Sequence, residues 1–327
     1  MTTDVAVISL GGTIAMGRRG DDGLAVSLGA TDFARLLSER RPDLEVSGVN
    51  LAHRDSSELT MDDLAILADE IAHVAAAGVR RVIVTTGTDS LEEIAFGLER
   101  VVPDGVTVVV TGAMRSPTLE SHDGPANLVA ALSVLSSPSR ESLGVLVVMN
   151  DEIHGADFVR KSHATSASSF TSYPGPLGWV ANDEALLVTR PTHRRARLPL
   201  PLEETPRVVP LLTTYLGDGG HALRALASTP LDGVVIEAFG SGRLAPGTAE
   251  VARELASRLP VVIASRTGAG LLERSTYSAA GSEGRLFAAG VLNAGWLTGV
   301  QARLLLELGL RTGATKDLPR LFEQFQT

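Results

Sequence analysis

The chain has 327 residues, of which 44% are hydrophobic, and its 38 acidic side chains outnumber 29 basic ones for a formal net charge of −9. This length and apolar content exclude a disordered chain and predict two domains of ordinary size. The acidic balance argues against a nucleic-acid partner, and the absence of cysteine excludes disulfides, thiolate zinc sites and iron–sulfur clusters.

No apolar run approaches the ~20 residues that cross a bilayer. The first residues, Met1 to Asp4, lack the basic and apolar regions of a signal peptide. We therefore expect a soluble cytoplasmic protein that has neither a membrane nor a nucleic acid as its partner.

Short β-branched runs alternate with helical patterns up to about residue 150. The expected strands are 5–10, 44–50, 81–85, 107–111 and 143–149, and the expected helices are 32–40, 60–77, 90–101 and 124–136. Thr60 is expected to cap the second helix, and Ser90 and Glu93 have the spacing of a capping box at the third. Strands separated by helices in this way predict a parallel sheet covered on both faces.

The alternation stops after residue 149 and resumes near residue 208. Residues 151–178 show no long apolar period, 179–188 fit a short hairpin, and the prolines and arginines of 190–207 indicate an exposed linker. Further strands are expected at 208–212, 233–238 and 260–265, with helices near 220–228 and 246–258 and a last helix near 298–309. The predicted organisation is a large doubly wound, mostly parallel α/β domain over 1–190, a linker over 191–206 and a smaller α/β domain over 207–327.

Ligands of parallel sheets bind beyond the carboxyl ends of the strands, so the residues that follow each strand are candidates for a site. Hydroxyl groups, an acid and an amine gather at these positions. In chain order the candidates are Thr13, Ser56, Ser57, Thr88, Asp89, Ala113 and Lys161. Lys161 is one of only two lysines in the chain.

Each candidate also has an ordinary structural explanation. Thr13 fits a helix cap, Asp89 fits a carboxylate that stabilises a helix start, and Ser56 and Ser57 fit turn residues. The joint placement of these residues on one rim favours a site. No dinucleotide fingerprint, phosphate loop, serine elbow or zinc-binding helix is present in the sequence.

Two sequence blocks carry a resemblance to a known family. Residues 9–15, Ser-Leu-Gly-Gly-Thr-Ile-Ala, and residues 85–93, Thr-Thr-Gly-Thr-Asp-Ser-Leu-Glu-Glu, resemble the two signatures of bacterial-type L-asparaginases. Residues 111–115, 123–127 and 147–151 are similar to further blocks of that family. The resemblance implies hydrolysis of the side-chain amide of L-asparagine to L-aspartate and ammonia without a cofactor. It also implies a homo-oligomer, commonly a dimer of dimers, in which the small domain of one subunit contributes to the site of its neighbour.

The resemblance assigns roles to the candidate residues. Thr13 would be the nucleophile on a mobile loop, and Thr88, Asp89 and Lys161 would form a second catalytic group. Asp89 would also hold the α-ammonium group of the substrate. The remaining roles are the α-carboxylate site at Ser56, with Ser57 beside it, and the amide pocket, to which the backbone of Ala113 would contribute.

The chain departs from the family pattern in the loop and in the small domain. Family members usually carry a tyrosine on the loop after the nucleophile, but residues 17–23 contain none. Tyr277 is a candidate replacement from a neighbouring subunit, or else an ordinary surface tyrosine. Ser241 stands where many members have asparagine, and Glu273 and Glu283 are alternative candidates for a small-domain glutamate near the substrate amine.

The residue types agree with the implied chemistry. A threonine hydroxyl needs a base during attack, and with no histidine on the rim Lys161 is the available base, acting through Thr88. Burial favours the neutral amine, whereas Asp89 favours the ammonium form. Our hypothesis is that the ammonium of a bound substrate engages Asp89 and weakens its pull on Lys161. Backbone N–H groups at the following helix start would stabilise the oxyanion.

Two other functions fit parts of the pattern. A solute-binding protein also has two α/β domains and a polar cleft, but such proteins are normally exported. An amidotransferase component that acts on aminoacyl-tRNA would carry an additional amino-terminal domain, and the acidic charge opposes an RNA partner. The sequence leaves open the preference for asparagine or glutamine and the choice between dimer and tetramer.

Overall fold

The computed structural model describes residues 3–18, 24–26, 28–140, 143–191, 197–203, 205–313 and 315–326, with side chains left out at 18 and 24–26. The chain divides into two compact units, Met1–Arg197 and Leu198–Thr327. This division falls inside the segment 191–206 that we predict as a linker. Of the loop after Thr13 that lacks the tyrosine usual in the family, residues 17–23, most (19–23) lies outside the described residues.

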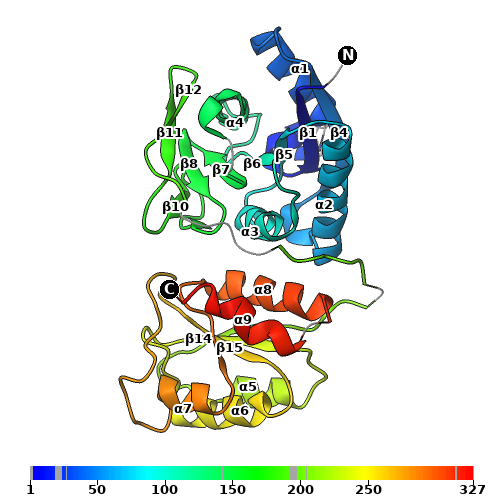
Figure 1. Ribbon diagram of the computed structural model, residues 1–327. Coiled ribbons are helices and arrows are strands. Elements are labelled where there is room, and N and C mark those ends of the chain that lie inside the picture. Colours follow the sequence, from blue (N-terminus) through cyan, green and yellow to red (C-terminus); the bar gives the residue numbers. More distant parts are fainter. Residues whose placement is uncertain are drawn as a thin grey trace. The chain divides into compact units, whose positions relative to one another are not determined.

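The first unit is built on an eight-stranded sheet of order β12-β11-β8-β7-β6-β5-β1-β4 (Figure 1). Five neighbouring strands are parallel: β4 (Val46–Arg54), β1 (Val5–Gly11), β5 (Arg81–Thr85), β6 (Thr107–Thr111) and β7 (Val145–Met149). The sheet continues in antiparallel fashion through β8 (Glu152–Gly155), β11 (Gly178–Ala181) and β12 (Glu184–Leu187). Apart from the outer strand β4, the parallel strands are buried almost throughout, as a sheet covered on both faces requires.

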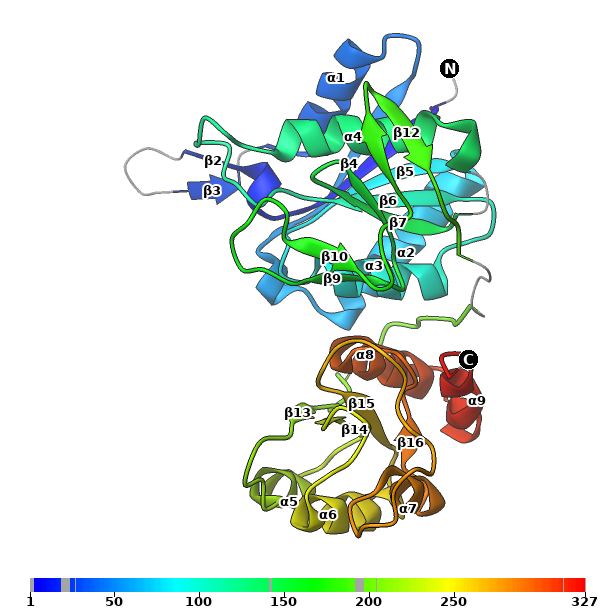
Figure 2. The ribbon, with the colours of Figure 1, turned by 90° about the vertical axis from the view of Figure 1, so that its left-hand side faces the viewer.

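Two pairs of helices cover the two faces of this sheet. The helices α1 (Ala30–Arg40) and α4 (Gly124–Ser136) pack on one face, and α2 (Met61–Ala76) and α3 (Leu91–Val101) lie on the other (Figure 2). The shorter elements are η1 (Thr13–Ala15), β2 (Met16–Arg18), β3 (Leu24–Val26), η2 (Ser56–Glu58), η3 (Pro138–Arg140), β9 (Val159–Lys161) and β10 (Phe170–Ser172). The predicted cap of α2 is confirmed, because Thr60 Oγ1 accepts the Asp63 N–H at 3.3 Å.

The second unit has a four-stranded parallel sheet of order β13-β14-β15-β16. The strands are β13 (Leu211–Thr213), β14 (Val234–Ala238), β15 (Val261–Ser265) and β16 (Leu292–Asn293). Its helices are α5 (His221–Ala227), α6 (Pro246–Ala256), α7 (Glu283–Ala288), α8 (Gly299–Arg311) and α9 (Leu318–Glu323), and the turn η4 (Thr315–Asp317) precedes α9. Figure 1 shows α5 and α6 on one face of this sheet and α8 on the other. The predicted fold class, two α/β units built on mostly parallel sheets, is confirmed.

The structure corrects several local predictions. Ser90 does not form the expected capping box; its hydroxyl donates instead to the backbone carbonyl of Ser56 at 3.0 Å. The strand β4 continues to Arg54, β7 begins at Val145, and β13 covers Leu211–Thr213. The helix expected to be the last, near 298–309, is followed by α9.

The segment 151–178 contains short strands that its composition did not reveal. It forms β8, β9 and β10, which are too short to show a clear period, and the side chains of His154 and Ser172 join β8 to β10 through a 2.8 Å hydrogen bond. Within the described ranges, no helix is long and apolar enough to cross a membrane.

Candidate active site

The loops after β1, β4 and β5 pack against one another through glycines. A Cβ atom on Gly12 would lie 2.2 Å from the backbone nitrogen of Gly87, and one on Gly87 would lie 2.5 Å from Ser56 Oγ. Gly12 also has a φ of +83°, which side chains rarely adopt. Since Thr13 and Thr88 directly follow these glycines, the close approach brings both threonines and Ser56 to one place at the sheet edge.

Lys161 joins this edge from the strand β9. Its Nζ donates to Thr88 Oγ1 at 2.9 Å and to Asp89 Oδ1 at 2.6 Å. The lysine side chain is 16% exposed, whereas that of Asp89 is 67% exposed, so the amine is enclosed while the carboxylate faces solvent. The structure therefore brings together the hydroxyl, acid and amine that the sequence singled out. A lone ion pair with so exposed a partner adds little to stability, which argues against a purely structural role for this lysine.

Ala113 lies beside this group, because a Cβ on the preceding Gly112 would be 3.3 Å from Thr88 Cγ2. The loop after β6 that contains Ala113 is fixed by one carboxylate. Asp123 accepts the N–H groups of the two residues after Ala113 at 3.0 and 2.9 Å. The backbone at Ala113 is thus held in place next to Thr88.

The two candidate serines after β4 differ in their surroundings. Ser56 is buried, 4% exposed, and touches the position next to Thr88 described above. Ser57 is exposed, and both its N–H and its hydroxyl bond to Asp55 Oδ1 at 3.1 Å. For Ser57, the structure fits the explanation as a turn residue.

Glu92, in the first turn of α3, is a contact of Lys161 that the sequence pattern does not predict. One of its carboxylate oxygens accepts the backbone N–H of Lys161 at 2.5 Å. Burial raises the pKa of Glu92 to about 7, and Glu93 adds to this rise, while the bond from Lys161 and the charge of Arg160 oppose it. The sequence drew attention only to Glu93, through its spacing from Ser90.

The candidates of the small domain belong to the second unit. Tyr277 is 44% exposed, and its ring lies 4.2 Å from the guanidinium carbon of Arg243. The backbone carbonyl of Ser241 accepts a hydrogen bond from the N–H of Glu273. Glu273 is exposed. Glu283 is fully buried and accepts the N–H of Tyr277 at 2.9 Å. Of the two candidate glutamates, only Glu273 is therefore open to a ligand from outside the unit.

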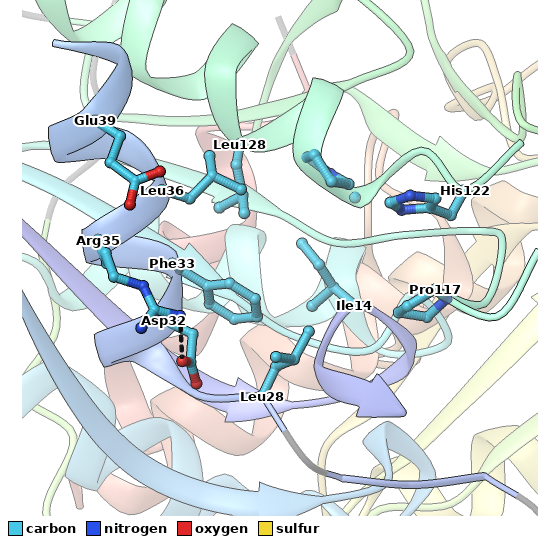
Figure 3. A pocket seen from close by; sticks show the side chains of 12 residues that line it. Ile14, Leu28, Asp32, Phe33, Arg35, Leu36, Glu39, Pro117, His122 and Leu128 are labelled. Carbon is cyan, nitrogen blue, oxygen red and sulfur yellow. Dashed lines mark hydrogen bonds and ion pairs between the residues drawn. The ribbon is translucent and has the colours of Figure 1, made fainter. Parts of the chain in front are cut away.

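An apolar cavity of about 510 Å³ lies between α1 and α4, and Ile14, the residue after Thr13, is one of the residues that line it (Figure 3). Ile14, Phe33 and Leu128 supply apolar walls, and Asp32 and Arg35 form an ion pair at its margin. None of the candidate site residues lines this cavity. The polar candidate residues therefore lie at the sheet edge and not in this apolar cavity.

Together, the fold and the site define a two-domain α/β protein with threonine, aspartate and lysine gathered at the carboxyl edge of its larger sheet. Residues 4–193 match the family model "Asparaginase, N-terminal", and residues 208–322 match "Glutaminase/Asparaginase C-terminal domain". The chain belongs to the asparaginase family.

Individual relatives support this assignment over the whole length. A protein of Deinococcus radiodurans described as a probable L-asparaginase is 36% identical, covering 98% of this chain and 97% of its own. L-asparaginase 2 of Escherichia coli is 27% identical over 98% of this chain and 93% of its own. The crystal structure of a probable cytoplasmic L-asparaginase from Campylobacter jejuni superposes with a TM-score of 0.86 at 28% identity, covering 98% of this chain and 99% of that one.

Proposed function

We propose that the protein is an L-asparaginase, which hydrolyses the side-chain amide of L-asparagine to L-aspartate and ammonia. The observation that carries this proposal is the Lys161 amine bonded to both Thr88 and Asp89, at the edge where Thr13 also lies. Relatives with this activity in their names, matched over nearly the whole chain, support it.

In the proposed reaction the Thr13 hydroxyl oxygen forms a bond to the amide carbon of the substrate. Its proton passes to the Lys161 amine through Thr88 and then to the leaving nitrogen, so the C–N bond breaks and ammonia departs. Water then cleaves the resulting ester, which releases L-aspartate and restores the Thr13 hydroxyl. Arginine in place of Lys161 could not accept the proton, because its guanidinium does not deprotonate in proteins.

Asp89 links substrate binding to this proton transfer. In the structure its carboxylate accepts a hydrogen bond from the Lys161 amine at 2.6 Å. When the α-ammonium of the substrate binds Asp89, it competes for that carboxylate and frees the amine to act as a base. Ser56 would hold the α-carboxylate of the substrate, with the backbone of Ala113 at its amide.

We further propose that the enzyme is a homo-oligomer, in which the second unit of a neighbouring copy completes each site. The exposed side chains of Glu273 and Tyr277, together with Ser241, are the candidates for this contribution. We also propose a cytoplasmic enzyme, in line with the description of the Campylobacter jejuni relative.

The test is the rate of ammonia release from L-asparagine, L-glutamine and D-asparagine by the parent and by Thr13→Ala. Loss of the nucleophile should lower kcat on L-asparagine by about 10³-fold or more. Thr229→Ala, which removes an exposed hydroxyl that bonds only locally in the second unit, is the control and should keep the parental rate. Tight binding of L-asparagine without ammonia release would support a solute-binding protein instead, and full activity of Thr13→Ala would remove Thr13 from the chemistry.

A further inference from the structure

The short segment 88–92 forms hydrogen bonds with both the backbone and the side-chain amine of Lys161. Thr88 Oγ1 and Asp89 Oδ1 accept hydrogen bonds from Lys161 Nζ at 2.9 and 2.6 Å. Four residues after Thr88, the carboxylate of Glu92 accepts the backbone N–H of Lys161 at 2.5 Å. The three bonds fix where the lysine side chain begins as well as where it ends.

The strand that carries Lys161 needs such an attachment. The strand β9 is three residues long and pairs only with β10, in a two-stranded sheet separate from the eight-stranded one. The large sheet therefore does not hold Lys161 through strand pairing, whereas Glu92 ties this residue to α3, which packs against β6 and β7 of that sheet. A lysine side chain has four rotatable bonds, so a shift of its backbone would spread the positions of Nζ over several ångströms.

We infer that Glu92 is a positioning residue, which holds the backbone of Lys161 so that the amine meets Thr88 and Asp89. This inference rests on the proposed function, because it assigns Lys161 a role in proton transfer. Glu92 itself acts through Lys161 and has no direct role in the bond changes. Misplacing a catalytic group by about 1 Å can lower the rate of a reaction ~100-fold, so loss of the bond between Glu92 and the Lys161 backbone should have a measurable effect on kcat.

The side chain of Glu92 has two separable properties, its hydrogen-bond acceptor and its charge. Its half-buried carboxyl, whose pKa is raised to about 7, faces the charges of Arg160 and Lys161 on β9 and of Glu93 on its own helix. Glutamine keeps an acceptor of similar reach but carries no charge, and methionine keeps the length of the side chain but has no comparable acceptor. If Glu92 acts by holding the Lys161 backbone in position, Glu92→Gln should keep most of the kcat that Glu92→Met loses.

The same helix offers a matched control. Glu99 lies two turns after Glu92 and uses the same kind of bond, its carboxylate accepting the backbone N–H of Val145 at 2.7 Å. That bond anchors β7, which carries none of the candidate site residues. Loss of the Glu99 bond should therefore destabilise the fold without a selective effect on turnover.

The experiment measures kcat and KM for ammonia release from L-asparagine, together with Tm, for the parent, Glu92→Met, Glu92→Gln and Glu99→Met. Glu92→Met should lower kcat by about 10- to 100-fold and change KM by less than about threefold. Glu92→Gln should recover kcat to within about threefold of the parent, whereas Glu99→Met should lower Tm and leave kcat within about twofold. If Glu92→Met does not fold, Glu92→Ala takes its place in the same comparison.

The outcomes separate this inference from the proposed function. A parent protein that releases no ammonia would contradict the proposed function itself. An active parent together with a Glu92→Met variant of unchanged kcat would overturn only the role of Glu92. Equal losses in Glu92→Met and Glu92→Gln would also overturn it, because the acceptor alone would then not explain the effect.

Discussion

The two units of the chain carry different polar groups at comparable positions of their sheets. Both have parallel strands with polar side chains at the carboxyl ends. In the second unit these side chains bond to one another or to the backbone: Thr213 donates to Glu237 at 2.5 Å, and Ser265 donates to the carbonyl of Gly240 at 2.9 Å. In the first unit, by contrast, the amine of Lys161 donates hydrogen bonds to Thr88 and Asp89.

The difference lies in where that amine comes from. Lys161 is delivered by β9, which belongs to a separate two-stranded sheet, while the described part of the second unit has only its four-stranded sheet. The other lysine of the chain, Lys316, lies in the turn η4 and is exposed. Parallel topology alone therefore gathers polar groups at an edge, and in the first unit the separate strand β9 brings an amine to that edge.

The largest expected effect tests the two lysines against each other. Lys161→Arg keeps the positive charge beside Asp89 but removes the ability to accept a proton, so kcat on L-asparagine should fall by about 10³-fold, a barrier increase of about 4 kcal/mol. Lys316→Arg is the matched control in the second unit and should leave kcat unchanged. Steady-state ammonia release measures both, and near-normal turnover of Lys161→Arg would refute the base assignment.

Much of the fold could be predicted from the sequence, because the central strands of both sheets are short buried runs bounded by turn residues. The bounds of β5, β6 and α4 agree with the expected ranges 81–85, 107–111 and 124–136 to the residue. Reading the residues after each strand was enough to select Thr88, Asp89 and Lys161, since the carboxyl ends of parallel strands share one edge.

What the sequence could not predict depends on tertiary partners. The spacing of Ser90 and Glu93 favours a local capping box, but the hydroxyl of Ser90 finds the carbonyl of Ser56, which is distant in the sequence. Two adjacent glutamates at the start of α3 look alike in the sequence, and only the position of β9 shows that Glu92 anchors Lys161. Local patterns do not contain information on which neighbour a side chain will meet.

The next effect concerns a buried histidine in the antiparallel part of the first sheet. Burial lowers the pKa of His154 to about 4. A carboxylate oxygen of Glu152 lies 3.5 Å from its Nε2, and this nitrogen has no hydrogen-bond partner among the described residues that would offset the burial. As the pH is lowered, the His154 imidazole takes up a proton near pH 6.5 in the unfolded chain, and only at lower pH in the folded one. The contribution of His154 to the free energy of unfolding is therefore complete above about pH 6.5 and is lost as the pH falls towards 4, by up to about 3 kcal/mol.

His154→Gln should remove this part of the pH dependence, because glutamine does not titrate. Urea unfolding at pH 7.5 and pH 4.5 measures it as a difference between variant and parent, so that other titrating groups cancel. His221→Gln in the second unit is the control, since His221 is exposed, and it should keep the parental dependence. A His154→Gln variant with an unchanged pH dependence would show that the imidazole takes up its proton at the same pH in the folded and unfolded chains.

The smallest effect compares two tightly packed glycines, one in each unit. Gly12 has a φ of +83° and leaves no room for a Cβ against Gly87, while Gly220 has a φ of +78° and would place a Cβ 2.8 Å from the carbonyl oxygen of Gly247. Alanine at either position strains the backbone and pushes two loops apart, so both variants should lose stability.

Only the Gly12 contact lies at the edge that holds Thr13 and Thr88, so the two variants should differ in activity. Gly12→Ala should lower kcat/KM on L-asparagine by about 100-fold, or about 2.7 kcal/mol, because the two threonines move apart. Gly220→Ala should keep kcat/KM within about threefold once the folded fraction is taken into account. Equal losses in kcat/KM would mean that general loosening, and not the spacing of the two threonines, governs the rate. Such a result would contradict a role in turnover for the close approach of the loops after β1 and β5.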